Sequence, residues 1–481
     1  MNHIIQRQYL EVELNGTEND GLVLQSRLSD LCQHWLLPAL ERAMDRTGLQ
    51  AEHLYIDRLE LDAGVFRLDE LEHDFVEAVA QALEKTVREQ LAVPETVAKR
   101  QVNVGNWQRK SDDRMVWDVL LHFLETGRLP WYFQMPANTS LEQHLWHNLQ
   151  KKSLQPATIA AIVRLLATTS AGQKRMAWQF STEFKKAFLQ HIAPELMQTL
   201  HAVLETMPRM AIADSEQTLL EQALWQTTFA QIESTAAVTV SELVAKALQI
   251  MGEKSSWQPS QALSDGIKTI WPALLTPPGK TAAQTRADAT SDQDVSPDTA
   301  PSPSAVQEER YWAKNTETEI YIDHAGLVLL HPFLPMFFEA LQISKGSELL
   351  QPERALCLLH FLATGQEVVP EYDLVLPKLL CNILIENPVH TDILLSQSEK
   401  EEAAALLKAV IRHWNALRDT SPDALRGTFL CRPGKLSLRD SGDWQLQVEK
   451  KSYDILLDQL PWGIGMIQLP WMPRMLWVDW N

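Results

Sequence analysis

The sequence predicts a mainly α-helical protein with small β elements (α+β), built from several domains. Apolar residues recur at helical spacing through most of the 481 residues. Alternation of apolar and polar residues is confined to short stretches near the two ends. We therefore expect five parts: an N-terminal α+β domain (1–92), a connecting segment with one helix (93–134), a helical middle region (135–276), a disordered linker (277–309) and a C-terminal domain (310–481).

The N-terminal part is predicted to be a βαβα unit. Residues 9–14 and 54–62 alternate apolar with polar side chains, as half-buried strands do. After each of them, apolar residues repeat at helical spacing, first from Leu24 to Leu40 and then from Leu68 to Val87. The second strand also carries Asp57, Glu60 and Asp62. Strand alternation places Asp57 on the opposite face from the other two, so we interpret them as a solvated edge rather than a metal site.

An octapeptide occurs twice. LLHFLETG at residues 120–127 returns as LLHFLATG at residues 358–365, with seven of eight residues identical. Each copy has the leucine spacing of an amphipathic helix and ends in a glycine, which favours a left-handed C-terminal cap, and a proline follows within a few residues. The repetition suggests two related halves. We interpret it as a reused helix-ending module without shared chemistry, because shared structure often carries no shared reaction.

The middle region, residues 135–275, is predicted to be helix after helix, with Pro194 and Pro208 between segments. His144 and His147 stand three residues apart on one helix, but no matching set of Asp, Glu or Cys lies nearby, so we expect no metal there. The linker that follows consists mainly of Thr, Ala, Ser, Asp, Gln and Pro. Such a segment cannot offset its chain entropy by burial. A recognition segment that orders on a partner stays open as the alternative.

The C-terminal part begins with a hydrophobic block, residues 325–338. His331 precedes Pro332, which favours an extended backbone at position 331. A lone histidine in an apolar run is more often a core residue than a catalyst. Further on, an apolar stripe over residues 406–414 indicates a helix, and Ser421 is expected to cap a short helix with Pro422 at its first position.

Residues 435–439 and 444–449 alternate around residues 440–443, which predicts a β-hairpin. The chain finishes with a tryptophan-rich segment that we expect to be buried or bound. Arg426, Arg432, Asp440 and Glu449 could build a polar pocket, but we interpret them as surface pairs, because arginine and acid on a hairpin usually lie at the surface.

Charge and composition exclude several classes. The chain has 62 acidic against 43 basic residues and a formal net charge of -19, which argues against a nucleic-acid binder. The N-terminus lacks an apolar signal core, and no run approaches the ~20 apolar residues of a membrane helix, so no membrane insertion is expected. The four cysteines, Cys32, Cys357, Cys381 and Cys431, lie apart among apolar residues and are expected to be reduced core thiols.

A search for catalytic patterns favours a structural or binding role. The sequence has no G-x-S-x-G, no G-x-x-x-x-G-K-[ST], no G-x-G-x-x-G after a strand and no H-E-x-x-H. We therefore expect no enzymatic activity, no cofactor and no bound metal.

Several long motifs resemble those of a known family. They are His53–Asp62, Phe123–Trp131, Ala325–Pro335, His413-Trp414 with Thr420-Ser421, Leu425-Arg426, Phe429-Leu430, Tyr453–Asp458 and Leu460-Pro461-Trp462. On these residues the chain resembles the contractile injection system tape measure protein family, found in gene clusters for phage-tail-like extracellular injection particles. The resemblance implies a structural assembly protein that sets the length of the inner tube and lies in its lumen during assembly, after synthesis in the cytoplasm. An assembly chaperone, or an adaptor that docks tube, baseplate or cargo components, is the alternative.

The implied partners are inner-tube, baseplate or spike proteins of the particle, without nucleic acid or membrane, and a homo-oligomer stays open. The side chains that we expect to contact them are Leu327, His331, Pro332, Phe333, Trp414, Trp462, Trp471, Trp477 and Trp480. A ruler needs an extended segment, and the middle region would reach about 210 Å as one straight helix. Its prolines and predicted caps argue against a single rod.

Overall fold

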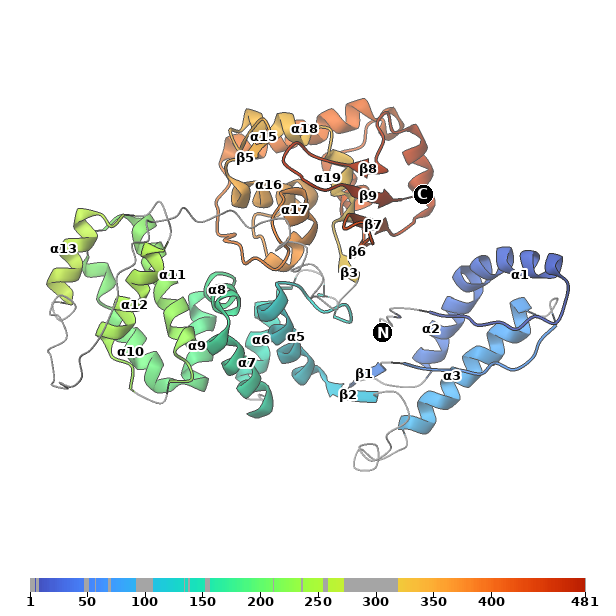
Figure 1. Ribbon diagram of the computed structural model, residues 1–481, viewed down its shortest axis with the longest axis horizontal. Coiled ribbons are helices and arrows are strands. Elements are labelled where there is room, and N and C mark those ends of the chain that lie inside the picture. The colour runs from blue at the N-terminus through green and yellow to red at the C-terminus, as the bar shows by residue number, and fades with distance from the viewer. Residues whose placement is uncertain are drawn as a thin grey trace, which may run out of the picture. The chain divides into compact units, whose positions relative to one another are not determined.

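The computed structural model describes residue 5 and residues 8–46, 52–56, 58–67, 71–91, 107–133, 135–136, 139–151, 156–210, 212–234, 237–253, 258–271 and 319–480. Contacts within the chain define two compact units, unit 1 with residues 1–119 and 132–155 and unit 2 with residues 120–131 and 156–481. Helices dominate and the sheets are small (Figure 1). The predicted fold class is therefore confirmed. The expected linker, residues 277–309, lies outside the described residues.

Helices form the core of unit 1. α1 (Glu18–Leu31), η1 (Cys32–Leu36) and α2 (Leu37–Asp45) follow one another, and η2 (Leu71–Phe75) leads into α3 (Val76–Leu91). Leu31, Leu40, Phe75, Leu83 and Val87 are buried together in one apolar cluster. The two helical stretches predicted from apolar spacing are thus confirmed. The unit also holds β1 (Glu52–Ile56), β2 (Trp107–Ser111), α6 (Leu141–Gln150) and the first part of α5 (Asp112–Thr126).

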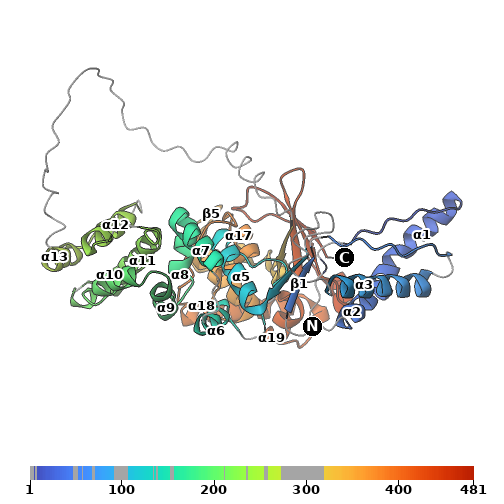
Figure 2. The same ribbon diagram turned by 90° about the horizontal axis from the view of Figure 1, so that it is seen from below.

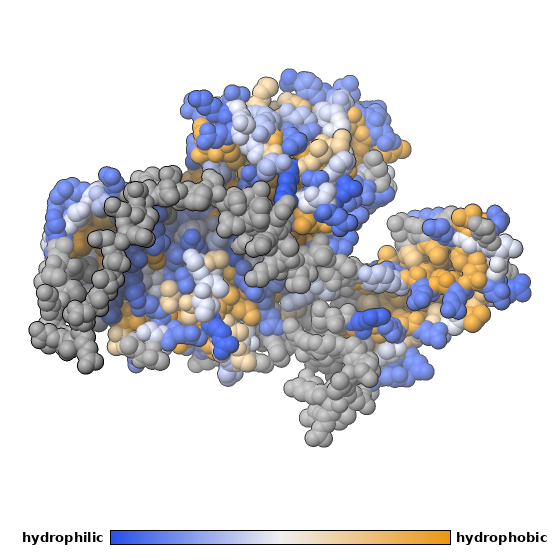
Figure 3. Space-filling model, viewed as in Figure 1, coloured by the Kyte–Doolittle hydropathy of each residue, from blue (hydrophilic) through white to orange (hydrophobic). Residues whose placement is uncertain are grey.

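The strand prediction for this unit was wrong in part. Residues 8–15 are extended but belong to no strand. Of the second predicted strand, residues 54–56 belong to β1, which pairs antiparallel with β2, residue 57 lies outside the described residues, and residues 58–62 belong to no strand. Alternation requires only that one face of an extended chain is buried, and Leu10, Leu59 and Leu61 indeed pack against the helical core. Figure 2 draws β1 as an arrow and shows residues 8–15 and 58–62 as traces. On the face drawn in Figure 3, unit 1 carries many hydrophobic residues.

The helical region of unit 2 is a series of short helices. They are α7 (Pro156–Thr168), α8 (Ser170–Trp178), α9 (Thr182–Ile192), α10 (Pro194–Leu204), η3 (Met207–Arg209), α11 (Asp214–Ala230), α12 (Val240–Gly252) and α13 (Gln261–Ile270). Ser181, Thr239 and Ser260 each accept a hydrogen bond from a backbone N–H of the following helix. The longest helix, α11, has 17 residues and spans about 26 Å. The prediction of helix after helix, rather than one rod, is confirmed.

A five-stranded sheet lies in the C-terminal part of unit 2. Its order is β3 (Glu319–Ile322), β6 (Gly434–Leu438), β7 (Trp444–Val448), β9 (Leu476–Asp479) and β8 (Met466–Ile467). The predicted hairpin is confirmed, because β6 and β7 pair antiparallel with Leu436 opposite Leu446. The tryptophan-rich end supplies β9, which runs parallel to β7.

Helical segments pack around this sheet. They are η5 (Ala325–Leu330), α15 (Leu334–Ala340), α16 (Pro352–Thr364), η6 (Glu371–Leu374), α17 (Val375–Leu380), α18 (Gln397–His413), η7 (Asn415–Leu417), α19 (Pro422–Leu425), η8 (Arg426–Leu430) and η9 (Ser452–Gln459), with a small ribbon of β4 (Ser344–Lys345) and β5 (Glu348–Leu349). Ser421 caps α19 as predicted, since its hydroxyl accepts from Ala424 N–H. A large apolar cluster fills the space between these elements.

Two positions show how packing decides the local backbone. His331 was expected to be extended but is helical (φ -51°, ψ -37°), because its N–H donates to Val328 O at the end of η5. This hydrogen bond and the burial of η5 override the preference of a residue before proline. At Gly326, an added Cβ would lie 1.7 Å from Phe429 O, so the contact of η5 with η8 requires glycine. No helix in the described ranges is both long and apolar enough to cross a bilayer.

Candidate functional site

Several of the predicted contact residues lie inside the C-terminal part of unit 2. Leu327, Trp414 and Trp471 are buried. The indole N–H of Trp414 donates to Leu456 O (3.0 Å), and that of Trp471 donates to Leu380 O (2.7 Å). Buried indoles need such acceptors. The Trp414 contact therefore ties the end of α18 to η9, and the Trp471 contact ties the tryptophan-rich segment to α17. Whether these residues also contact a partner stays a prediction.

Trp480 belongs to a polar cluster with Arg432 and Asp454. Arg432 is buried and pairs through two nitrogens with Asp454, at 2.8 Å to each carboxylate oxygen. The indole N–H of Trp480 donates to the same carboxylate (3.2 Å), and the guanidinium lies over the rings of Tyr453 and Trp480. Burial alone would raise the pKa of Asp454, but these hydrogen bonds and one from a backbone N–H lower it. The interpretation of Arg432 as a surface residue was wrong.

The other three residues interpreted as surface pairs, Arg426, Asp440 and Glu449, differ in exposure. Asp440 and Glu449 are exposed, as expected, and Glu449 pairs with Lys451. Arg426 is half-buried and pairs with the exposed Asp423 (2.7 Å). The ring centroid of the half-buried Trp477 lies 4.8 Å from Arg439 Cζ. These contacts do not form a common polar pocket.

An aromatic patch brings three separate segments together at the surface. The half-buried Phe333 ring packs edge-on against Trp462, with centroids 5.2 Å apart, and tilts against His413 at 5.9 Å. Pro332 next to it is exposed, and Met336, one helical turn on, is 79% exposed. We define Pro332, Phe333, His413 and Trp462 as the aromatic patch. Its residues come from three of the motifs that carry the family resemblance: Ala325–Pro335, His413-Trp414 and Leu460-Pro461-Trp462.

Internal hydrogen bonds fix this patch. The indole N–H of Trp462 donates to Leu329 O (3.1 Å), and His331 Nδ1 lies 2.9 Å from Val328 O. Burial lowers the pKa of His331, so its imidazole is neutral near pH 7. His331 is therefore a half-buried support behind the patch rather than a charged surface group.

The two octapeptide copies end in the same way. Gly127 (φ +77°) and Gly365 (φ +74°) are left-handed, as predicted for C-terminal caps. In each copy, the threonine hydroxyl donates to the histidine carbonyl four residues earlier, at 2.8 Å. The same hydroxyl accepts from the N–H two residues on. The sequence similarity therefore reflects a shared helix-ending structure.

A distant arginine caps each of these helix ends. Arg175 Nη1 donates to Leu124 O (3.0 Å) and Glu125 O (2.9 Å). Arg426 Nε donates to Leu362 O (3.1 Å). Leu124 and Leu362 occupy the same place in the two copies. Each arginine thus satisfies helix carbonyls that have no partner within their own helix and places a cation at the negative end of the helix dipole.

Arg175 also belongs to a buried charge cluster in unit 2. Its Nε lies 3.1 Å from Glu371 Oε1, and Lys378 Nζ lies 2.8 Å from the same oxygen. Lys378 also donates to Ile385 O (2.9 Å) and Asn387 O (2.8 Å). All three charged side chains are at most 1% exposed. Burial lowers the pKa of Lys378, and Glu371 opposes that shift.

This cluster joins α8 to the C-terminal part of unit 2. Gln179 accepts from Glu371 N–H (3.0 Å) and donates to Val389 O (3.1 Å). Gln222 of α11 lies 2.7 Å from His390 Nε2. Sequence reasoning missed these residues, although two signals existed. Lys378 is a lone charge in an apolar run, and TSAGQKR at 169–175 and TSPDALR at 420–426 share the spacing from threonine-serine to arginine.

A second polar group lies near the octapeptide of α16. His360 is buried, its Nε2 lies 3.5 Å from Asp373 Oδ2, and its ring packs edge-on against His324. Burial lowers the pKa of His324. Within the described residues, no group of three or more His, Cys, Asp or Glu side chains could hold a metal ion. The cluster has the packing of a structural His–Asp pair.

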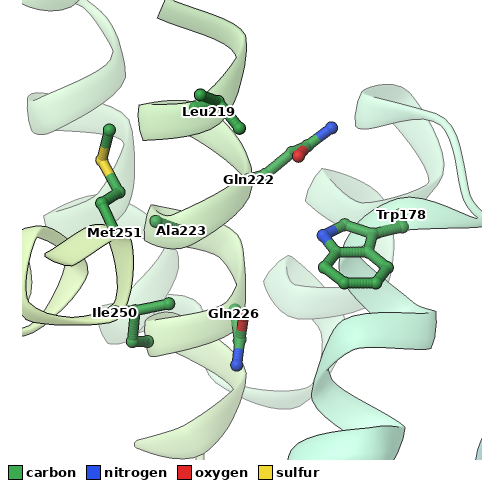
Figure 4. A pocket seen from close by; sticks show the side chains of 7 residues that line it. All are labelled: Trp178, Leu219, Gln222, Ala223, Gln226, Ile250 and Met251. Atoms are coloured by element: carbon green, nitrogen blue, oxygen red, sulfur yellow. The ribbon is translucent and has the colours of Figure 1, made fainter. Parts of the chain in front are cut away.

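One hollow opens in the helical region of unit 2 (Figure 4). It is lined by Trp178 of α8, Leu219, Gln222, Ala223 and Gln226 of α11, and Ile250 and Met251 of α12. Its cavity volume of ≈ 20 Å³ holds about one water molecule. A substrate would not fit there, since ligand pockets usually measure about 300–1,000 Å³.

Comparison with known proteins gives one family. The sequence model of the family described as "Contractile injection system tape measure protein" matches residues 2–480. No curated protein and no solved structure matches this chain.

Proposed function

The chain belongs to the contractile injection system tape measure protein family, a family of structural proteins, and we propose that it sets the length of the inner tube during assembly. The observation that carries this proposal is the extent of the match, residues 2–480, because a shared single domain would cover only part of the chain. The length-setting role is what the family name implies.

The helical region limits how such a protein can measure. In the described residues of the helical region of unit 2, a folded copy offers helices of at most about 26 Å, the length of α11. The same region would be several times longer as one helix, and longer again as an extended chain, at about 3.3 Å per residue. We propose that length is measured either by a chain that opens inside the tube or by several compact copies.

The buried cluster around Arg175 bears on that choice. It holds α8 to the segment that contains Glu371 and Lys378. A chain that opened along the tube would separate these pairs and expose the apolar surface packed around them, and a native domain typically resists unfolding by about 5–15 kcal/mol. Opening therefore needs compensation, which tube subunits that bind the released helices would supply.

We also propose that the aromatic patch contacts a component of the particle. Phe333 and Trp462 are half-buried, and His413, Pro332 and the neighbouring Met336 are exposed. Aromatic side chains supply much of the affinity at protein interfaces. Phe333→Ala should abolish a pull-down with tube, baseplate or spike proteins. Val368→Ala, at a position that is 80% exposed elsewhere in the same part of the chain, is the matched control.

Deletion of the whole chain tests the proposed function. Particles assembled without it should have inner tubes of scattered length in electron micrographs, whereas particles that contain it should have tubes of one length. Tubes of one length in its absence would overturn the proposal. A complete loss of particles would replace it with a role in initiating assembly.

A further inference from the structure

Residues 9–14 of unit 1, Tyr-Leu-Glu-Val-Glu-Leu, form an extended segment with an unusual degree of exposure. Tyr9 is 83% exposed, Val12 45% and Leu14 37%, and Glu11 and Glu13 are exposed as well. Leu10 packs partly against the apolar cluster of the unit, and Leu14 Cδ2 lies beside Gly21 of α1. The segment has the composition and alternation of a strand, yet most of its apolar surface faces solvent.

The backbone of this segment is unpaired with respect to every described residue. None of its N–H or C=O groups makes a hydrogen bond to another described part of the chain, and it belongs to neither strand of the β1–β2 pair. A strand with a free row of donors and acceptors is a template for pairing with another strand. Such a strand can also add to the exposed edge of another protein's sheet. In this interaction, called β-augmentation, main-chain hydrogen bonds supply the affinity.

A second segment of unit 1 has the same character. Residues 58–63 alternate in the same way, with Leu59 and Leu61 against the core and Arg58 and Glu60 exposed. They too lack backbone hydrogen bonds to described residues. Figures 1 and 2 show both segments as extended traces beside α1 to α3. Both extended segments therefore contact the helices of unit 1, and neither belongs to a sheet of the described residues.

Charge decides what kind of strand can pair with residues 9–14. Among antiparallel pairings of two copies that keep the apolar faces on one side, the two registers that align five of residues 9–14 place Glu11 opposite Glu11 or opposite Glu13. A parallel pairing in register would place each glutamate beside its counterpart. Like charges at such positions destabilise a sheet, and opposite charges stabilise it. Self-pairing is therefore disfavoured, and a basic partner strand is favoured.

We propose that residues 9–14 pair with an edge strand of another protein in which apolar residues alternate with Lys or Arg. Main-chain hydrogen bonds hold the two strands, Val12 and Leu14 share an apolar face with the partner, and Glu11 and Glu13 form cross-strand ion pairs. This inference does not depend on the proposed role in tube length, because it concerns only how residues 9–14 bind another strand.

Peptide binding to the full chain tests the charge preference. A fluorescent peptide of alternating valine and lysine should bind, and one of alternating valine and glutamate should bind about tenfold more weakly or not at all. The double variant Glu11→Lys, Glu13→Lys should reverse this preference. The matched control is Glu401→Lys, Glu402→Lys on α18, which changes the net charge equally at two exposed positions and should leave the preference unchanged. Equal binding of both peptides by the wild-type chain would overturn the proposal.

Hydrogen exchange tests the pairing itself. In the free chain the amides of residues 9–14 should exchange without protection, and the bound valine–lysine peptide should slow them at least tenfold. Binding without this protection would show attraction between charges alone and would contradict strand pairing. Protection in the free chain that grows with protein concentration would show self-pairing, and protection independent of concentration would show a partner within the chain. Either result would also contradict the proposal.

Discussion

Arg175 and Arg426 cap the two octapeptide helices at the same carbonyl, that of Leu124 in the first and of Leu362 in the second. Each arginine follows a threonine-serine pair at the same spacing, so the shared module comprises two pieces, a helix end and the helical turn that caps it. The copies differ in burial. The Arg175 side chain is 0% exposed and is paired with Glu371, whereas the Arg426 side chain is 14% exposed.

This difference predicts unequal costs of removing the two caps. Arg175→Met should lower the free energy of unfolding of unit 2 by about 3 kcal/mol or more, since it removes one of the two cations that pair with Glu371 and leaves several buried carbonyls without a donor. Arg426→Met should cost only about 1 kcal/mol, because water can reach the groups that it leaves. Denaturant unfolding followed by tryptophan fluorescence measures both. Equal losses of unfolding free energy in the two variants would show that the buried cluster around Arg175 adds nothing to stability.

The two cap glycines should also respond unequally to alanine. Both have positive φ, so each substitution is expected to cost about 1–2 kcal/mol. At Gly127 the new Cβ would in addition lie 2.6 Å from Glu371 Oε1, whereas at Gly365 the nearest atom, on Arg426, is 3.4 Å away. Gly127→Ala should therefore lower the melting temperature more than Gly365→Ala. A smaller shift for Gly127→Ala would mean that the cluster relaxes without cost.

Acid should weaken the contact between Arg354 and Glu399. Hydrogen bonds from Arg354, opposed by burial and helped by Ser396, lower the pKa of Glu399 to about 2. A carboxylate whose pKa is lower in the folded state stabilises the fold above its unfolded pKa of about 4.3, and this stabilisation is lost as pH falls toward 2. The melting temperature of the wild-type chain should thus fall more steeply over this range than that of Glu399→Gln. Parallel curves for the two proteins would contradict the assigned ion pair.

The cysteines should react with alkylating reagents in a fixed order. Burial raises the pKa of Cys357 to about 12 and also raises that of Cys381, so neither forms a thiolate near pH 8. Cys32 and Cys431 are only half-buried. Mass spectrometry after iodoacetamide treatment of the native protein should find Cys32 and Cys431 modified before the other two. Early modification of Cys381 would show that its surroundings open in solution.

Local patterns were sufficient to predict much of the fold. Apolar spacing predicted the helices of unit 1, and the cap chemistry of Ser421 and Pro422 predicted the start of α19. The hairpin of β6 and β7 followed from strict alternation on both sides of a polar turn. Each of these features depends on residues that are close in sequence, which is why they could be found without a structure.

Contacts between distant residues were beyond such patterns. Alternation in residues 9–14 indicates one apolar face but not a pairing partner, so a segment that is unpaired among the described residues was predicted as a strand. Arg432 was expected at the surface because its half-buried acceptor, Asp454, comes from another element. The pairing of Arg175 with Glu371 joins residues 196 positions apart. Sequence spacing gives no access to pairs of this kind.

The central claim, that the helical region determines tube length, is tested most directly by duplicating one helix. Repeating residues 239–252, which comprise α12 and its capping threonine, adds a helix with its own start signal. The mean inner-tube length in electron micrographs should then rise with each added copy, by about 1.5 Å per residue if the insert stays helical along the tube and about 3.3 Å if it is extended. An insertion of equal length in the β6–β7 turn should leave the tubes unchanged. Tubes whose length does not respond to repeats of α12 would contradict the account.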